Sequence, residues 1–282
     1  MYKIGLSTTG EKLQEETIKE YAESGIEFIE ISTSKEATDA IDFEDLKKWC
    51  NTYGVKIWSF HLPFCPFEEI DISRENLADK TVSYLTSIIK KACSIGINKF
   101  IIHASGEPIE ENARKDRMEC AKKSLYALCV VAKEYGATIC VEDLPRTCLG
   151  RNSSDILELL ESHPDLKVCF DTNHLLAEDN IEFIKKIGNK IVTLHVSDYD
   201  FINERHWLPG EGKNDWQGIL NALKEIDYKG IWLYEINRKT PNTIIRQRDL
   251  EFSDFVRNAK ELFENKEITV FSEPKPNLGF WD

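Results

Sequence analysis

Short, continuous apolar runs alternate with longer segments of helical periodicity along almost the whole chain. Apolar runs of four or five residues without polar alternation are typical of strands buried on both faces. We expect strands at Lys3–Leu6, Glu27–Ile31, Lys56–Phe60, Lys99–Ile102, Thr138–Val141, Lys167–Phe170, Ile191–His195 and Ile231–Tyr234. The helices are expected at Leu13–Ser24, Phe43–Tyr53, Arg74–Ile95 (capped by Asp71 or Ser73), Ala113–Tyr135, Ser154–Ser162, Ile181–Ile187 (capped by Asp179 or Asn180), Trp216–Ile226 and Leu250–Phe263.

This strict alternation predicts parallel strands joined by crossover helices. Repeated eight times, it matches the closed (β/α)₈ TIM barrel, an α/β fold. An open doubly wound sheet usually has a glycine-rich turn after its first strand, whereas this chain has Ser7-Thr8-Thr9-Gly10 there. We therefore expect one barrel domain over residues 1–265. Residues 266–282 break the pattern and form a tail, whose Phe280 and Trp281 are expected to dock onto the barrel or a neighbouring molecule.

The composition limits the partners and the compartment. The chain has 282 residues, of which 41% are hydrophobic, and a formal net charge of −13. Such a charge repels phosphate backbones and anionic lipids, so we expect no nucleic acid partner. No run reaches the roughly 18 apolar residues of a membrane helix, and the first residues do not resemble a signal peptide. Eight scattered cysteines without a C-x-x-C pair fit a reducing cytoplasm.

Residues that can bind a metal stand at or near the ends of seven of the eight predicted strands. They are Glu30, His61, His103, Glu142, Asp171, His195 and Glu235. Barrel enzymes carry their chemistry on this rim, because the carboxyl ends of all the strands meet there. The loop after the seventh strand adds Asp198, Asp200, Glu204, His206 and Glu211. Carboxylates that face one another in an apolar barrel need a cation, since burial and like charge both oppose their ionisation.

Four of these residues come from strands five to eight and are therefore adjacent around half of the barrel: Glu142, Asp171, His195 and Glu235. Three carboxylates and one imidazole suit a divalent Mn, Mg, Co or Zn ion and leave room for substrate oxygens. The sequence therefore predicts one divalent metal ion held by this quartet.

The chain resembles the xylose isomerase-like barrels, a superfamily of ketose 3-epimerases, inosose dehydratases, hydroxypyruvate isomerases and nucleases of the endonuclease IV type. The resemblance covers about residues 3–263. The motifs that carry it are His61 in Ser-Phe-His-Leu-Pro, Glu142 in Val-Glu-Asp, Asp171-Thr-Asn-His174, His195 in Leu-His-Val-Ser-Asp, Arg205-His206-x-x-Pro209-Gly210-x-Gly212, and Glu235 in Tyr-Glu-Ile.

For the epimerase branch, the resemblance implies that the quartet holds one metal and that Glu142 and Glu235 also exchange the proton. It implies that the chain is an enzyme, an isomerase or epimerase acting on a small sugar or sugar phosphate next to a carbonyl. We expect six residues to contact the substrate: His61, His103, His174, His206, Trp207 and Glu211. One departure stands out, because Cys148 occupies the position where these epimerases carry a further substrate glutamate.

Three alternatives remain open at this point. The first is dehydration of an inosose-like cyclitol. The second is a zinc nuclease for abasic sites, since that branch uses equivalents of the whole rim for three zinc ions, with Glu204-x-His206 here in place of Asp-x-His. Net charge and few basic rim residues (Arg146, Arg151, Arg205 and Arg238) argue against it. The third is a barrel that binds sugar without turnover. The sequence also leaves assembly into a homo-oligomer open.

Overall fold

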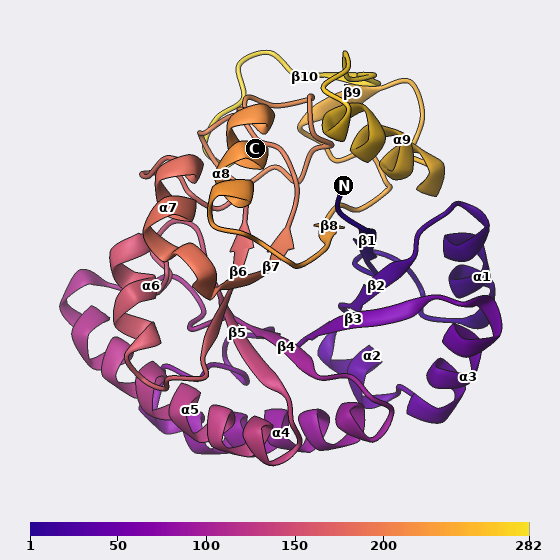
Figure 1. The fold of residues 1–282 in the computed structure, drawn as a ribbon. Coiled ribbons are helices and arrows are strands. Elements are labelled where there is room, and N and C mark those ends of the chain that lie inside the picture. The colour runs from indigo at the N-terminus through magenta and orange to yellow at the C-terminus, as the bar shows by residue number, and fades with distance from the viewer. Residues whose placement is uncertain (282) are drawn as a thin grey trace.

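Eight parallel strands form a closed barrel in the computed structural model, which describes residues 1–281 (Figure 1). The strands are β1 (Ile4–Ser7), β2 (Phe28–Ile31), β3 (Lys56–His61), β4 (Lys99–Ile102), β5 (Thr138–Glu142), β6 (Lys167–Asp171), β7 (Ile191–His195) and β8 (Trp232–Tyr234). Parallel ladders run from β7 down to β1 and on to β8. The last junction closes through an isolated bridge between Val196 and Tyr234, so the predicted TIM barrel is confirmed.

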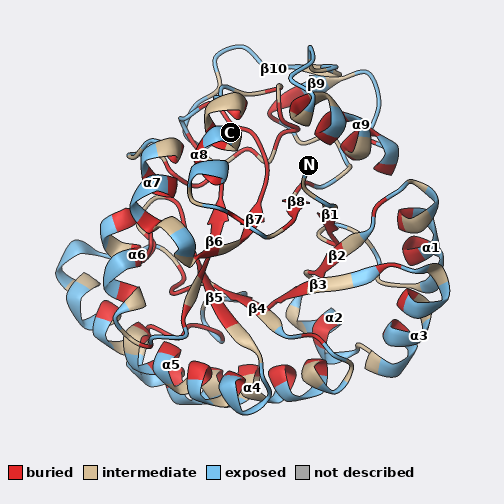
Figure 2. Cartoon of the chain, in the orientation of Figure 1, coloured by how far each residue is buried: buried red, intermediate tan, exposed pale blue. Residues whose placement is uncertain are grey.

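Helices surround the barrel and turn their buried sides toward it (Figure 2). They are α1 (Glu15–Glu23), α3 (Phe43–Tyr53), α4 (Glu75–Ser94), α5 (Arg114–Glu134), α6 (Ser153–Leu160), α7 (Asn180–Ile187), α8 (Trp216–Glu225) and α9 (Phe252–Phe263). Each predicted helix is present, with ends shifted by a few residues. Asp179 caps α7 as expected, through hydrogen bonds from the Ile181 and Glu182 amides. Neither Asp71 nor Ser73 caps α4, because Asp71 is engaged by Arg117 and by Ser73 itself.

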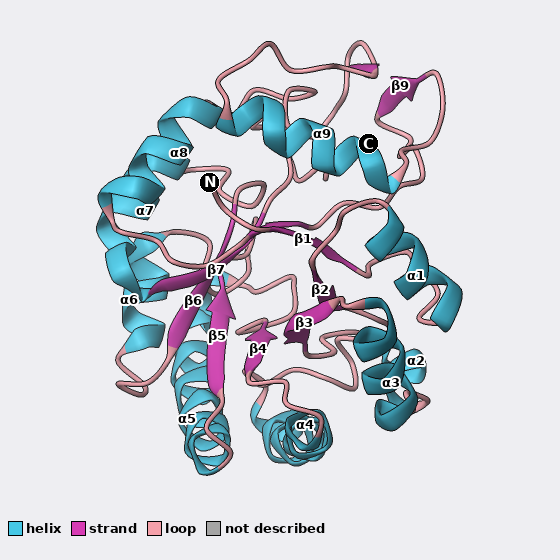
Figure 3. Ribbon diagram, turned by 45° about the vertical axis from the view of Figure 1, so that its right-hand side comes forward, coloured by secondary structure: helices cyan, strands magenta, loops and turns pink. Residues whose placement is uncertain are grey.

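Several short elements have no counterpart in the sequence prediction. They are α2 (Lys35–Asp39), the 3₁₀ turns η1 (Glu111–Ala113) and η2 (Gly188–Lys190), and the strands β9 (Ile244–Arg246) and β10 (Ser272–Pro274). The strands β9 and β10 pair antiparallel, apart from the barrel sheet (Figure 1), and β9 lies beside α9 (Figure 3). A strand of three residues is too short to show a period, and its partner lies far along the chain. The domain boundary at residue 265 stays a prediction.

The types of side chain inside the barrel change along its axis. A small apolar cluster of Ile101, Cys140 and Cys169 fills the middle. Closer to the amino ends of the strands, the Lys99 ammonium lies 3.3 Å from the centre of the Trp58 ring. At the carboxyl ends the buried side chains become carboxylates and imidazoles. The buried carboxylates and imidazoles of the barrel interior therefore gather at the end where the pocket opens.

Two further expectations concern the chain as a whole. All eight cysteines are free, as their spacing predicted. Among residues 1–281, no helix is long and apolar enough to cross a membrane.

Candidate metal centre and pocket

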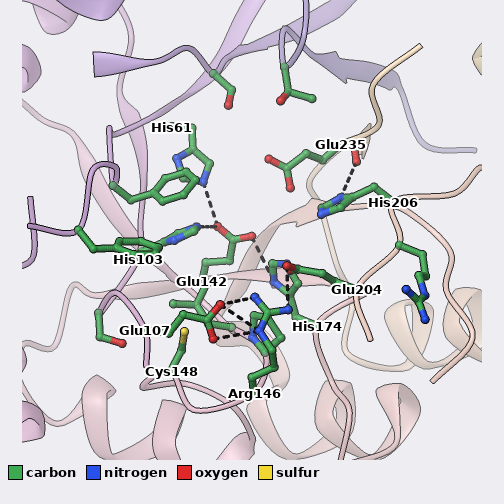
Figure 4. A pocket seen from close by; sticks show the side chains of 18 of the residues that line it. His61, His103, Glu107, Glu142, Arg146, Cys148, His174, Glu204, His206 and Glu235 are labelled. Carbon is green, nitrogen blue, oxygen red and sulfur yellow. Dashed lines mark hydrogen bonds and ion pairs between the residues drawn. The ribbon is translucent and has the colours of Figure 1, made fainter. Parts of the chain in front are cut away.

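A cavity of about 560 Å³ opens at the carboxyl ends of the strands (Figure 4). Its lining includes Glu142 and Glu235 together with His61, His103, His174 and His206. A volume of this order is typical of small-molecule sites. The pocket therefore lies where barrel enzymes carry their active sites.

The predicted quartet converges beneath this pocket. The His195 Nδ1 atom lies 2.8 Å from Glu142 Oε1, 3.2 Å from Glu235 Oε2 and 3.9 Å from Asp171 Oδ2. One donor atom from each of the four residues lies within 4.8 Å of all the others. Asp171 and His195 are fully buried. The strand ladders explain the approach, because Asp171 and His195 are register partners on β6 and β7.

The quartet fits a divalent ion in its chemistry. Asp171 Oδ2 is buried and has no hydrogen-bond partner among the described residues. Burial, together with the charges of Glu235 and Glu142, raises the pKa of Asp171 to about 6 although His174 opposes this. A buried carboxylate oxygen without a donor is costly, and a cation between the carboxylates would remove that cost. Mn²⁺, Mg²⁺, Co²⁺ and Zn²⁺ all accept such oxygen and nitrogen ligands.

The two glutamates behave differently from the aspartate. Burial alone would raise the pKa of Glu235, but the charge and hydrogen bond of His195 outweigh it and lower the pKa to about 2. The same opposition, with hydrogen bonds from His195, His103 and His61, holds the pKa of Glu142 well below its usual value. Both glutamates are therefore ionised at neutral pH.

Glu30 orients the quartet's imidazole from behind. Its Oε1 lies 2.9 Å from His195 Nε2, and its Oε2 accepts a 2.6 Å hydrogen bond from the Ser59 hydroxyl. A carboxylate can only accept, so both ring nitrogens of His195 donate, Nε2 to Glu30 and Nδ1 to Glu142. Because Glu30 retains the Nε2 proton, the Nδ1 proton is the one that a divalent ion would replace. The sequence placed Glu30 on the rim but gave no reason for its role.

Two further groups of possible donors flank the quartet. In the first, the Nε2 atoms of His61 and His103 lie 3.1 and 3.2 Å from Glu142 Oε2. The ring of Phe64 stacks on that of His103, with centroids 3.9 Å apart. In the second group, His174, Glu204 and His206 bring donor atoms within 4.8 Å of one another.

A network of Arg146, Glu107, Asn203 and Glu204 forms one wall of the pocket. The Arg146 Nε atom donates to both Glu107 carboxylate oxygens, each 2.9 Å away. Arg146 Nη1 lies 2.8 Å from Glu204 Oε1 and 2.8 Å from Asn203 Oδ1. Glu204 Oε2 in turn lies 3.3 Å from His174 Nε2. Neither Glu107 nor Asn203 could be assigned to the site from the sequence, because both lie in loops without a hydrophobic period.

The loop that follows β7 is shaped by one buried carboxylate, Asp198. Its two oxygens accept hydrogen bonds from the backbone amides of Tyr199, Gly210, Gly212 and Asn214 and from the Trp216 indole, at 2.8 to 3.1 Å. These donors come from both ends of the loop, so Asp198 ties its two arms together. The segment between the arms carries Glu204 and His206 to the pocket.

The sequence of residues 18–276 matches the family described as a xylose isomerase-like TIM barrel. The chain belongs to this family. The protein MJ1614 of Methanocaldococcus jannaschii, described as uncharacterized, is 24% identical over 178 residues, which is 62% of this chain and 70% of that protein. Fructoselysine 3-epimerase of Escherichia coli O157:H7 is 25% identical over 122 residues, 40% of this chain and 44% of the enzyme. A solved structure described as a D-tagatose 3-epimerase-like protein superposes with a TM-score of 0.80 at 22% identity, covering 93% of this chain and 97% of that one. This likeness shows that the fold is shared.

Within this family fold, most of the predicted site residues lie together. Glu142, Glu235 and all four predicted substrate histidines line the pocket, namely His61, His103, His174 and His206. Asp171 and His195 lie directly below. Cys148, which by the resemblance takes the place of a substrate glutamate, also lines the pocket.

Trp207 and Glu211 lie elsewhere. The Trp207 side chain is fully buried, and its indole donates to the Thr243 hydroxyl at 2.9 Å. A bridge between Asp198 and Trp207 folds the loop back on itself, which turns this ring into the protein. Glu211 accepts hydrogen bonds from Arg246 and the Leu208 amide instead of facing the cavity. The structure therefore does not bring these two predicted substrate contacts to the pocket.

Proposed function

We propose that this chain is a divalent-metal-dependent sugar epimerase or isomerase that moves a proton next to a carbonyl group. The observation that carries the proposal is the convergence of Glu142 and Glu235 on His195 Nδ1, from the non-neighbouring strands β5 and β8. The names of two related proteins, fructoselysine 3-epimerase and a D-tagatose 3-epimerase-like protein, support it.

The residues that would hold the ion are Glu142, Asp171, His195 and Glu235, with Glu30 fixing the imidazole. A divalent ion supplies Lewis-acid polarisation of a carbonyl, which makes the neighbouring C–H bond more acidic. One of the two glutamates removes the proton from that carbon. The other takes up a proton from solvent and returns it to the opposite face of the carbon, while the first glutamate releases its proton to solvent, so that the carbon is inverted without net gain or loss of atoms.

The remaining pocket residues fit the binding of hydroxyl groups. His174 and His206 lie on one side of the quartet, and His61 and His103 lie on the other (Figure 4). The two arginines that line the pocket are already engaged, because Arg146 pairs with Glu107 and Glu204 and Arg205 pairs with Asp200. Both of these arginines already face carboxylates, which opposes binding of a phosphate and favours an uncharged sugar.

The test is the exchange of solvent deuterium into a sugar. The protein, loaded with Mn²⁺ or Co²⁺, is incubated with D-fructose or D-tagatose in heavy water, and deuterium next to the carbonyl is followed by NMR. We expect one deuterium per inverted carbon and loss of the reaction with a chelator. Elimination of water without epimer formation would point to the dehydratase instead. Sugar binding without exchange would leave only the non-catalytic barrel.

The two flanking donor groups favour a second candidate, a zinc nuclease for abasic sites. His61, His103 and Glu142 would hold one additional ion, and His174, Glu204 and His206 another. The charges around the pocket oppose it. Arg146, Arg205 and Arg238 each lie within 3 Å of a carboxylate, and Arg151 lies 3.7 Å from Glu111. Three zinc ions per chain by elemental analysis, with chelator-sensitive incision of abasic DNA, would replace the sugar proposal by the nuclease.

A further inference from the structure

Residues 279–281 lie against the loop that carries Glu204 and His206. The Arg205 guanidinium donates from Nη2 to the Gly279 carbonyl at 2.7 Å. The Asn203 side-chain amide donates from Nδ2 to the Phe280 carbonyl at 2.6 Å. Backbone groups from the end of the chain are therefore bound by the loop after β7, about seventy-five residues earlier.

The same segment reaches the pocket wall through Arg146. The Arg146 guanidinium carbon lies 6.0 Å from the centre of the Trp281 ring, within the range of a cation–π contact. Arg146 Nη1 also donates to Asn203 Oδ1 at 2.8 Å. Asn203 thus joins two partners, since its oxygen accepts from the pocket arginine and its nitrogen donates to the chain end.

Two residues that line the pocket in this region have a left-handed backbone conformation, which non-glycine residues seldom adopt. Arg146 has a φ of 55° and His206 a φ of 52°, and both line the pocket. A non-glycine residue keeps such a conformation only where its surroundings hold it there. For Arg146 these surroundings include Glu107, Glu204, Asn203 and Trp281. For His206 they include the Asn173 side chain and the Glu235 carbonyl.

We propose that residues 277–281 are a positioning strap for the substrate-binding wall of the pocket. The strap holds Asn203 and Arg146, and through them it orients Glu204 toward His174. The hydrogen bonds and the ring contact of the strap run to Asn203, Arg205 and Arg146, whereas the quartet stands at the ends of the barrel strands. That this wall binds the substrate rests on the proposed function. We expect the strap to govern substrate affinity and not metal binding.

Two substitutions in the full chain each remove one contact between the strap and the pocket wall. Asn203→Asp keeps the oxygen that accepts from Arg146 but removes the donor to the Phe280 carbonyl. Trp281→Ala removes the ring beside Arg146, and Trp281→Phe restores an aromatic face. Val270→Ala is the matched control, because Val270 is an exposed apolar residue of the same tail, upstream of the strap.

The first measurement is hydrogen exchange of the Arg205 and His206 amides, which both donate to Asn173 Oδ1. We expect exchange to be about 2- to 10-fold faster in Asn203→Asp and Trp281→Ala, as for the loss of one hydrogen bond or cation–π contact. Trp281→Phe and Val270→Ala should exchange as the wild type does. The second measurement is D-tagatose turnover, where KM should rise by a similar factor while kcat and the Mn²⁺ affinity stay within about 2-fold.

The outcomes are separable. Unchanged exchange in both Asn203→Asp and Trp281→Ala overturns the strap, whatever the turnover shows. A fall in kcat or in Mn²⁺ affinity equal to the change in KM also overturns it, because the quartet would then depend on the tail. Faster exchange in a chain whose wild type does not turn over ketoses supports the strap and refutes the proposed function.

Discussion

The pocket has two halves that are built in different ways. The strand-borne half comprises Glu142, Asp171, His195 and Glu235, at or next to the ends of β5 to β8. The loop-borne half comprises Glu107, Arg146, Glu204 and His206. Backbone ladders fix the first half, whereas side-chain ion pairs and hydrogen bonds fix the second. A barrel can therefore keep its chemistry constant while its loops change what it binds.

The largest effect should come from the strand-borne half. Glu142→Gln and Glu235→Gln keep the shape of the side chain but remove the base. Each should lower kcat by about 10²- to 10⁴-fold, as is usual for a lost acid–base group. Turnover of D-fructose or D-tagatose is measured with bound metal determined on the same samples, and Glu134→Gln on the outer surface of α5 serves as control. Full turnover with full metal occupancy in both variants would leave these glutamates without a role in proton transfer.

A substitution at Glu30 tests whether this residue, which is hydrogen-bonded to His195, contributes to metal binding by the strand-borne half. Glu30→Gln can no longer act as a charged acceptor for His195 Nε2, so the imidazole loses its fixed orientation. We expect divalent metal affinity to fall by about 10- to 100-fold, measured by titration calorimetry with Mn²⁺. Ser59→Ala, which removes only the hydroxyl bound to Glu30, should have a smaller effect. Equal affinities in all three proteins would show that Glu30 is a packing residue.

Arg146 tests the loop-borne half. Arg146→Lys keeps the positive charge but cannot bind Glu107, Glu204 and Asn203 at once, because an ammonium lacks the planar fork. The KM for the sugar should rise by about 3- to 10-fold, with kcat and metal affinity nearly unchanged. Arg151→Lys is the control, since Arg151 is 36% exposed and pairs only loosely, at 3.7 Å. A fall in metal affinity in Arg146→Lys would mean that the two halves are not separate.

The smallest effect is expected at Asp254, outside both halves. Burial would raise its pKa, but hydrogen bonds from Arg248 and the Glu251 amide outweigh this and lower it. A lowered folded pKa contributes stability above the unfolded value of about 3.9 and loses it as the pH falls further. Asp254→Asn should therefore cost about 1 kcal/mol in the free energy of unfolding at pH 7, with the difference shrinking below about pH 4. Urea titrations at several pH values measure this, and kcat and KM should not change.

The difference between the halves also explains what the sequence could predict. Regular alternation of apolar runs and amphipathic helices predicted the barrel. The carboxylates and the histidine at the ends of strands five to eight then predicted the quartet. Arg146, Glu107 and Asn203 could not be brought together in this way, because their contacts join loops that are far apart in the chain. The same limit applies to Trp207, where a short bridge within the loop decides that the ring points inward.

The five hydrogen bonds accepted by Asp198 have a consequence for how such a pocket diversifies. They set the outline of the loop after β7 with a single side chain whose partners are mostly backbone amides. All five donors lie outside residues 200–206, so these bonds keep the two arms of the loop in place when side chains of that segment change. Exchanging this short segment between relatives, with Asp198 kept, is therefore an economical way for new substrate preferences to arise, in nature or in directed evolution.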